Sequence, residues 1–325
     1  MSKSQYTQIS LKKIKTISIK NRKSKVEIEN FAKPFVSEKK SFNQFVENFP
    51  NILVAKDLKI LVERIVESRK KKNPVIFMMG AHMIKVGLSP IIIDLIEKNI
   101  ITSIAMNSAS AIHDIETAFF GKTSEDVAEN ILDGTFGMSK ETGDFLNNSL
   151  KKNFKTNFGY GESLAKELIL KKAKYLNYSI IAKCFGKKIP ITIHAAIGTD
   201  INHQQPTMNG AVIGEMSFRD FKIFTNEVKK LCDGGVVLNF GSAVIMPEIF
   251  LKSLTIARNL KYKANGFTTA NFDMNFHYRP QQNIVQRPTQ NGGKGFYFIG
   301  HHEIMFPLLS AMIKSKIDEF DSIQR

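Results

Sequence analysis

The sequence contains no tryptophan, only two cysteines and no long apolar run. Cys184 and Cys232 have no closely spaced partners, so neither a disulfide framework nor a cysteine-based zinc site is indicated. No apolar stretch reaches the roughly 18 residues that span a bilayer. The amino-terminal stretch also lacks the unbroken apolar segment of a signal peptide. These absences predict a cytoplasmic protein with no membrane partner.

Acidic residues are outnumbered, with 46 Lys and Arg against 30 Asp and Glu and a formal net charge of +16. Residues 1–40 supply half of that excess, because they hold 11 basic and 3 acidic residues. The other lysines are scattered, without the basic stripe or interleaved aromatic residues typical of nucleic-acid binding. We therefore expect no nucleic-acid partner. The pattern predicts a basic N-terminal arm over residues 1–45 and a single domain over residues 46–325.

Short apolar runs recur along the chain, and each is followed by glycine or small polar residues and then by a helical pattern. Such runs are typical of buried strands in a parallel sheet. At least five β–α passages alternate, which predicts an α/β protein with a doubly wound, mostly parallel sheet and helices on both faces. The runs are NPVIFMMG, NIITSIAM, IPITIHAAI, GGVVLNFGSAV, GFTTANFDM and FYFIG.

Polar residues gather after these runs, at the predicted ends of the strands. The carboxyl ends of the strands in a doubly wound sheet form one ligand crevice. The sequence therefore predicts a shared site, with separate helix caps as the alternative. The segments expected at this site are 80–87, 107–116, 199–203, 241–242 and 268–273.

The densest polar segment is residues 198–221, directly after the run IPITIHAAI. We expect a polar loop there, followed by a helix that Ser217 caps and that carries Asp220 in its first turn. Residues 275–295 show no periodicity, which predicts a long loop. The turn at 80–87 can bring backbone N–H groups to a phosphate, but it lacks the G-x-G-x-x-G fingerprint, so a plain tight turn is the alternative.

His113, Asp114 and Glu116 form a titratable cluster just after the second run. A histidine and carboxylates at helical spacing can share a metal ion, but no close histidine pair completes a ligand set nearby. We therefore predict no metal. A metal hydrolase that uses the scattered histidines is the least favoured function.

Several stretches resemble the deoxyhypusine synthase family, more closely its bacterial deoxyhypusine synthase-like branch, over roughly residues 50–315. The resemblance implies a Rossmann-like NAD-binding domain and a homotetramer with active sites between paired subunits. It also implies NAD-dependent transfer of a butyl-imine group from a polyamine such as spermidine to an amine acceptor. The matching stretches are NSASAIHDIE with GKTSEDV, FGMSKETG, IPITIHAAIGTDI, GGVVLNFGSAV, GFTTANFDM and HHEIMFPLL.

The resemblance places the NAD contacts on Gly80, Ala81, Asn107, Ser108, Ala109, Thr199, Asp200, Gly241, Ser242, Thr269 and Ala270. The catalytic pattern departs from that of the family. Ile245, Met246 and Pro247 replace a Lys-His-His stretch, which leaves Glu248 as the nearest ionisable group. The tryptophan-bearing lysine motif is absent, so Lys294 in GGKG is the candidate nucleophile. A loop lysine without a chemical role is the alternative.

A polyamine substrate requires carboxylates for its ammonium groups and a base for the proton released on amine oxidation. His113 and His203 are the candidate bases, with ordinary core histidines as the alternative. The sequence thus predicts an alkyl-transferring enzyme, most specifically a homospermidine-type synthase. The missing Lys-His-His stretch motivates the alternative, a non-catalytic NAD-binding sensor or scaffold. The candidate carboxylates are Asp114, Glu116, Asp200, Glu248 and Asp273.

Overall fold

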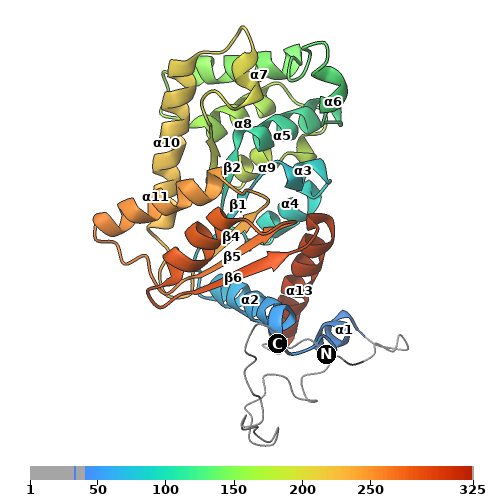
Figure 1. The fold of residues 1–325 in the computed structure, drawn as a ribbon, viewed down its shortest axis with the longest axis vertical. Helices are drawn as coiled ribbons and strands as arrows, with labels where there is room; N and C mark the ends of the chain where they lie inside the picture. Colours follow the sequence, from blue (N-terminus) through green and yellow to red (C-terminus); the bar gives the residue numbers. More distant parts are fainter. Residues whose placement is uncertain (1–32, 34–40, 324–325) are drawn as a thin grey trace, which may run out of the picture.

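The computed structural model describes residue 33 and residues 41–323 (Figure 1). Most of the predicted basic arm, residues 1–45, lies outside the described residues. Its last residues begin helix α1 (Phe42–Glu47), which Ser41 caps. The helices that follow are α2 (Leu53–Lys70), α3 (His82–Lys85), α4 (Ser89–Glu97), α5 (Ser108–Phe120), α6 (Val127–Asn130), α7 (Lys140–Asn153), α8 (Tyr160–Leu170), α9 (Ile180–Gly186), α10 (Gly210–Val228), α11 (Ile245–Asn259), α12 (Tyr278–Pro280) and α13 (His302–Ile323).

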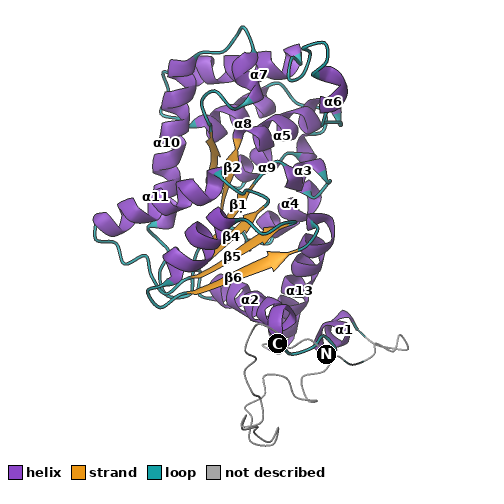
Figure 2. Cartoon of the chain, viewed as in Figure 1, coloured by secondary structure: helices purple, strands orange, loops and turns teal. Residues whose placement is uncertain are grey.

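The strands form one sheet through the middle of the molecule (Figure 2). They are β1 (Val75–Met79), β2 (Ser103–Asn107), β3 (Ile191–His194), β4 (Val236–Phe240), β5 (Thr268–Asp273) and β6 (Lys294–Ile299). Their order is β3-β2-β1-β4-β5-β6, and every neighbouring pair is parallel. This is the strand order of a Rossmann-like fold. The predicted doubly wound α/β fold is confirmed.

Both faces of the sheet are covered by helices, because successive strand residues point to opposite faces. In β1, Phe77 and Met79 join a core cluster with α2, α4 and α13. Ile76 and Met78 join a second cluster with α10 and α11. Figure 1 shows these two helix layers on either side of the strands. Burial on both faces explains why the strands read as unbroken apolar runs.

Four phenylalanines stack across neighbouring strands on the first face. The ring centroid of Phe240 lies 4.3 Å from that of Phe272 and 5.2 Å from that of Phe77. Phe272 in turn lies 4.6 Å from Phe298. The register pairs Phe240 with Phe272 and Phe272 with Phe298. Because stacked rings on adjacent strands require this alignment, the stack helps to fix the register of β4, β5 and β6.

The long loop predicted for residues 275–295 is wrong. The segment contains α12, a π-helical turn at Gln281–Gln286 and a 3₁₀ turn at Arg287–Thr289. Ile284 and Val285 are buried in the second core cluster. A parallel pair such as β5 and β6 needs a long crossover connection, and a helical segment usually provides it. The segment has few apolar residues among its prolines and glutamines, so its sequence shows no helical periodicity.

Helix α10 also begins earlier than predicted, because Asn209 is its N-cap and accepts a hydrogen bond from the backbone of Val212. Ser217 and Asp220 therefore lie within the helix instead of at its start. The Ser217 hydroxyl accepts a hydrogen bond from Ala195 N, directly after β3. The Asp220 carboxylate accepts hydrogen bonds from two backbone N–H groups, one of them in β3. These two side chains thus hold α10 against β3 and its exit.

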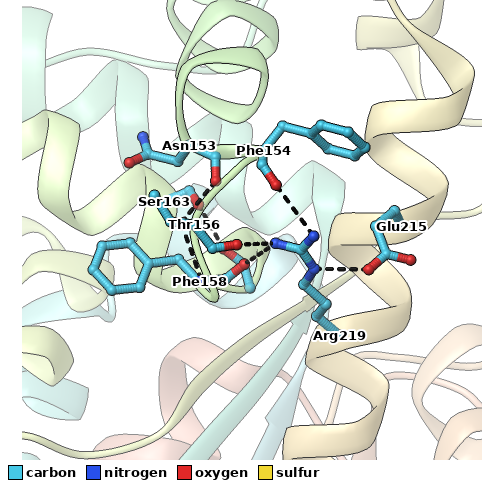
Figure 3. A network of polar contacts seen from close by, with 8 residues as sticks. Asn153, Phe154, Thr156, Phe158, Ser163, Glu215 and Arg219 are labelled. Atoms are coloured by element: carbon cyan, nitrogen blue, oxygen red, sulfur yellow. Dashed lines mark hydrogen bonds and ion pairs between the residues drawn. The ribbon is translucent and has the colours of Figure 1, made fainter.

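The neighbouring Arg219 fixes the connection between α7 and α8 (Figure 3). Its guanidinium donates hydrogen bonds to the carbonyl oxygens of Phe154, Thr156 and Phe158, at 3.1, 2.6 and 3.1 Å. Its Nε donates to Glu215 at 2.8 Å. One charged group therefore satisfies three carbonyls in the connection that follows α7. Arg219 therefore joins α10 to this connection through its side-chain hydrogen bonds.

Candidate functional site

The carboxyl ends of the six strands lie along one edge of the sheet, because all strands are parallel. Predicted site residues follow four of these strands. Gly80 follows β1, Ser108 follows β2, Asp200 lies in the segment after β3, and Ser242 follows β4. The structure therefore brings predicted residues from these four strands to one edge, and Asp273 at the end of β5 lies there as well.

Thr269 and Ala270 are not brought to that edge. They are the second and third residues of β5, and neither has any exposed surface. The Thr269 hydroxyl donates a hydrogen bond to Ile284 O at 2.7 Å. Ala270 packs in the first core cluster. β5 runs on to Asp273, so the NAD contacts predicted for these two residues do not fit their positions.

The strand order reverses between β1 and β4, the position where doubly wound proteins usually bind ligands. Gly80 and Gly241 face each other there. A Cβ atom on Gly80 would lie 2.2 Å from Gly241 O, and one on Gly241 would lie 2.8 Å from His302 Nε2. These two predicted cofactor residues therefore allow close packing inside the protein. Ala81 follows Gly80 directly and is the N-cap of α3.

His302 lies at this reversal point and is only 1% exposed. Neither of its ring nitrogens has a hydrogen-bond partner among the described residues. Burial is the main cause that lowers the pKa of His302, and the nearby His82 lowers it further. Its ring centroid lies 5.6 Å from that of His82 in α3. The neutral form of His302 is thus favoured at the centre of the carboxyl edge.

A cavity of about 610 Å³ opens beside the ends of β2 and β3. Its volume is in the range of small-molecule and cofactor sites. Ala109, His113, Glu116, Thr199 and Asp200, all predicted as site residues, line it. The structure therefore joins one predicted base with predicted cofactor and substrate residues. The other ionisable lining residues are Lys85, Lys122, Glu125 and Glu141.

His113 and Glu116 are connected through a threonine. The His113 Nδ1 atom lies 2.6 Å from the hydroxyl oxygen of Thr123. The same hydroxyl donates a hydrogen bond to one oxygen of Glu116, and Thr142 donates to the other at 3.1 Å. Because the single proton of Thr123 goes to the carboxylate, His113 must donate its Nδ1 proton to Thr123. The lone pair of neutral His113 is then on Nε2, which suits it to accept a proton.

Burial sets the protonation state of His113. It lowers the pKa of the imidazole to about 4, and the charge of Lys85 acts in the same direction. The side chain retains 16% exposure, so it can still meet a ligand in the cavity. His113 is therefore a neutral imidazole at physiological pH. A conjugate acid with so low a pKa also means that the base is weak.

Asp200 and His203, predicted as cofactor and catalytic residues, organise the segment after β3. The Asp200 carboxylate accepts a hydrogen bond from Ala196 N at 2.9 Å. His203 Nδ1 accepts one from Gly198 N at 3.1 Å, which leaves the proton on Nε2, 3.8 Å from an Asp200 oxygen. His203 does not line the cavity. It supports the loop that brings Thr199 and Asp200 there.

Two other predicted residues cap helices. Asp114 is fully buried and accepts hydrogen bonds from the Ser179 hydroxyl and from Ile180 N at the start of α9. Burial raises its pKa to about 6. The Asn107 side chain accepts a hydrogen bond from Ser110 N at the start of α5. Asp114 has no surface to offer a substrate, so the substrate-binding role predicted for it does not fit its position.

The remaining catalytic candidates lie outside the cavity. Lys294 begins β6, at the amino edge of the sheet, where its backbone N bonds Phe267 O. It is thus part of a strand and lies opposite the carboxyl edge within one chain. Glu248, in the first turn of α11, is paired with Lys252 and Arg279, and these partners lower its pKa. Glu248 is therefore held in ion pairs outside the cavity.

Asp273, predicted to bind substrate, does end β5 at the carboxyl edge. It is 6% exposed and accepts a hydrogen bond from Met274 N at 2.8 Å. Its Oδ1 atom lies 3.6 Å from His277 Nε2. The position agrees with the predicted edge, but Asp273 does not line the 610 Å³ cavity.

The sequence pattern assigns no role to Lys85, Lys122 and Asn202, which line the cavity or its inner end, or to the buried His302, although Lys85 and Asn202 lie within segments expected at the site. The two lysines stand in a lysine-rich sequence without a distinguishing pattern. Asn202 lies two residues after Asp200 in GTDIN, inside the segment 199–203 that the sequence places at the site. In the described part of the chain, no group of three or more His, Cys, Asp or Glu side chains could hold a metal ion. None of the described helices is long and apolar enough to cross a membrane.

No protein-family model and no curated protein matches the chain. Solved structures match it at low identity. The ternary complex of AgrE with ornithine and NAD⁺ gives a TM-score of 0.53 at 12% identity, over 87% of this chain and 34% of that one. A conserved putative LOR/SDH protein from Methanococcus maripaludis S2 gives 0.50 at 16% identity, over 80% and 69%.

A putative deoxyhypusine synthase from Entamoeba histolytica gives a TM-score of 0.49 at 12% identity, over 84% of this chain and 93% of that one. The present chain spans about a third of the length of the AgrE chain. At such identities the AgrE and LOR/SDH matches show a shared fold alone, and a fold hosts many functions. Function must therefore be argued from the cavity.

Proposed function

We propose that the protein is an NAD-dependent transferase that moves an aminoalkyl (butyl-imine) group from a polyamine such as spermidine to an amine acceptor. A homospermidine-type synthase, with putrescine as acceptor, is the most specific form of this proposal. The observation that carries it is the cavity at the carboxyl edge, where the neutral base His113 faces the same space as four carboxylates.

The residues at the start of α5 fit an NAD phosphate group. Ser108 is the first residue of α5; it is fully buried and does not line the cavity, so the helix N-terminus reaches the cavity through the next residue. The next residue, Ala109, lines the cavity together with Lys85 and Lys122. A helix N-terminus and two lysines favour an anion electrostatically. When bound, NAD would supply the hydride acceptor for amine oxidation.

The chain itself would bind the amine and move the proton. Glu116 and Asp200 supply negative charge for the ammonium groups of the polyamine. His113 Nε2 would accept the proton released on oxidation, with its ring oriented by Thr123. Lys294 lies at the opposite edge of the same chain, so the proposal assigns it no covalent step. The acceptor amine would attack the oxidised donor directly and expel diaminopropane, and the hydride removed in the first step would return to the new imine to give the saturated product.

Product analysis tests this function. The full-length protein is incubated with NAD, spermidine and putrescine, and the mixture is analysed by mass spectrometry. We expect homospermidine together with diaminopropane. His113→Gln should abolish most of the product, while Glu129→Gln, on the exposed side of α6, should not. Absence of both products with every polyamine tested would refute the proposal.

A second function is an NAD-binding sensor or scaffold without chemistry. It is favoured by the positions of Glu248, which is held in ion pairs, and Lys294, which lies away from the cavity. This reading predicts that NAD raises the melting temperature although no polyamine is turned over. Product formation in the experiment above would exclude it.

A further inference from the structure

The 610 Å³ cavity has an inner end beside α7 and the turn after β3. Its lining includes Glu116, Glu125, Asn202 and Gln205. Several of its residues, among them the two glutamates, also line the main cavity. The inner end is therefore a continuation of the site described above. Its chemistry differs from that of the outer part.

The inner end carries negative charge without a cation. Glu116 accepts hydrogen bonds from two threonine hydroxyls, and Glu125 accepts from Gly137 N and from the Asn130 amide. Neither carboxylate forms an ion pair with a lysine or arginine in the described part of the chain. Lys85 and Lys122 line only the outer cavity. Two carboxylates that share a confined space without a counter-ion attract a cation.

Asn202 provides an independent indication of a ligand. Its residue is only 3% exposed, and both the oxygen and the nitrogen of its side chain lack a partner among residues 41–323. A buried amide without partners costs free energy, so native proteins rarely leave one unused. Because Asn202 lines the inner end, a group bound there can accept from its nitrogen or donate to its oxygen.

The inner end admits only a small group. It offers about 10 Å³ for a water-sized occupant, close to the minimum for one water molecule. A primary ammonium is of similar size and donates three hydrogen bonds. The available acceptors are the two carboxylates, the Asn202 oxygen and the Gln205 oxygen. The Gln205 nitrogen donates a hydrogen bond to Gly137 O at 2.7 Å, which leaves the Gln205 oxygen to accept from the ligand. A trimethylated ammonium has no N–H group and is too large.

We propose that the inner end is a subsite for one primary ammonium terminus of the amine substrate, held by Glu116, Glu125 and Asn202. The choice of an amine rests on the proposed function. The subsite would anchor one end of the polyamine and leave the rest of its chain in the outer cavity, beside His113. It would thereby select substrates with an unmodified terminal amine.

Calorimetric titration of the full-length protein tests the subsite. The ligands are putrescine and its analogue with both ends trimethylated, which keeps the two positive charges. Each is titrated with and without NAD. We expect putrescine to bind at least tenfold more tightly than the analogue. Asn202→Leu and Glu125→Gln should each weaken putrescine binding at least tenfold, while the exposed Glu129→Gln leaves it unchanged.

Three results would overturn the subsite: no putrescine binding in either condition, equal affinity for the two ligands, or unchanged affinity in both variants. A melting curve shows whether each variant is folded, and Glu125→Gln decides the question if Asn202→Leu does not fold. Putrescine binding without any transfer product would refute the proposed function and leave the subsite standing. Product formation with an unchanged KM for the amine in both variants would refute the subsite alone.

Discussion

His113 depends on two neighbours for its proposed role. Thr123 fixes the tautomer because its hydroxyl donates a hydrogen bond to Glu116 and accepts one from His113 Nδ1. Burial keeps the ring neutral by lowering its pKa to about 4. The sequence could predict His113 and Glu116 from their helical spacing. It could not predict Thr123, because the contact depends on the turn after α5.

Replacing His113 tests whether the imidazole moves a proton. His113→Gln should lower kcat for polyamine transfer by roughly 10²- to 10⁴-fold, the usual contribution of a general base. Thr123→Val should lower kcat less, because it removes only the hydrogen bond that fixes the tautomer of His113. Steady-state kinetics with a melting-temperature control measures both. A His113→Gln enzyme with unchanged kcat would show that the base lies elsewhere.

Asp220 makes stability depend on pH. Burial raises the pKa of this carboxyl to about 8, above its ordinary value of 3.8. The folded protein therefore holds the proton more tightly, and the stabilisation present below about pH 4 is lost as pH rises through about 8. This group alone would lower the free energy of unfolding by at most about 1.4 kcal/mol per pH unit in that window.

Asp220→Asn should remove this pH dependence, because an amide does not titrate. The variant should still fold, since the amide oxygen can accept hydrogen bonds from the backbone N–H groups of Gly161 and Ile193. Urea unfolding at pH 5, 6, 7 and 8 checks the expectation. The wild-type protein should lose stability relative to the variant as pH rises. Parallel curves for the two proteins would mean that Asp220 is ionised throughout.

At the scale of elements, the phenylalanine stack is the clearest stability determinant. Phe272→Ala should lower the free energy of unfolding by about 3–5 kcal/mol, because it leaves a cavity between Phe240 and Phe298. Phe276→Ala is the matched control, since Phe276 is 59% exposed, and it should cost less than about 1 kcal/mol. Denaturant unfolding compares them. Equal losses would contradict the role of the stack.

All six strands could be predicted because each is a short, mostly apolar run, and all but β6 are buried along nearly their whole length. The start of α10 could not be predicted, because Ser217 and Asp220 have the spacing of a helix N-cap and an acidic residue in the first turn. These residues instead bind the backbone of β3 and its exit, a tertiary contact that a local pattern does not reveal. The helical turns at 278–289 could not be predicted for a similar reason, because their packing rests mainly on two apolar residues, Ile284 and Val285.

At the scale of the whole molecule, the sheet order places the site. The sequence predicted that strand ends would meet, but it did not fix which strands are neighbours. The order puts β2 and β3 side by side, so residues 109–116 and 199–201 share one cavity. Lys294 lies at the opposite edge because β6 begins with it. The homotetramer and the single domain over residues 46–325 stay predictions.

The net charge of the whole chain and the charge of the cavity have opposite signs. The chain has a net charge of +16, and half of the excess is in residues 1–40, which lie almost wholly outside the described part. The cavity has a negative charge instead, because four carboxylates and only two lysines line it. A local negative potential in a basic protein favours a cationic substrate there.

Hydrogen exchange of the full-length protein, read by mass spectrometry with and without NAD and putrescine, tests most directly whether this cavity is the ligand site. We expect slower exchange on ligand addition in residues 108–125 and 199–205, with no change in residues 287–294 at the amino edge of the sheet. Slower exchange only at the amino edge, or no change anywhere, would contradict it.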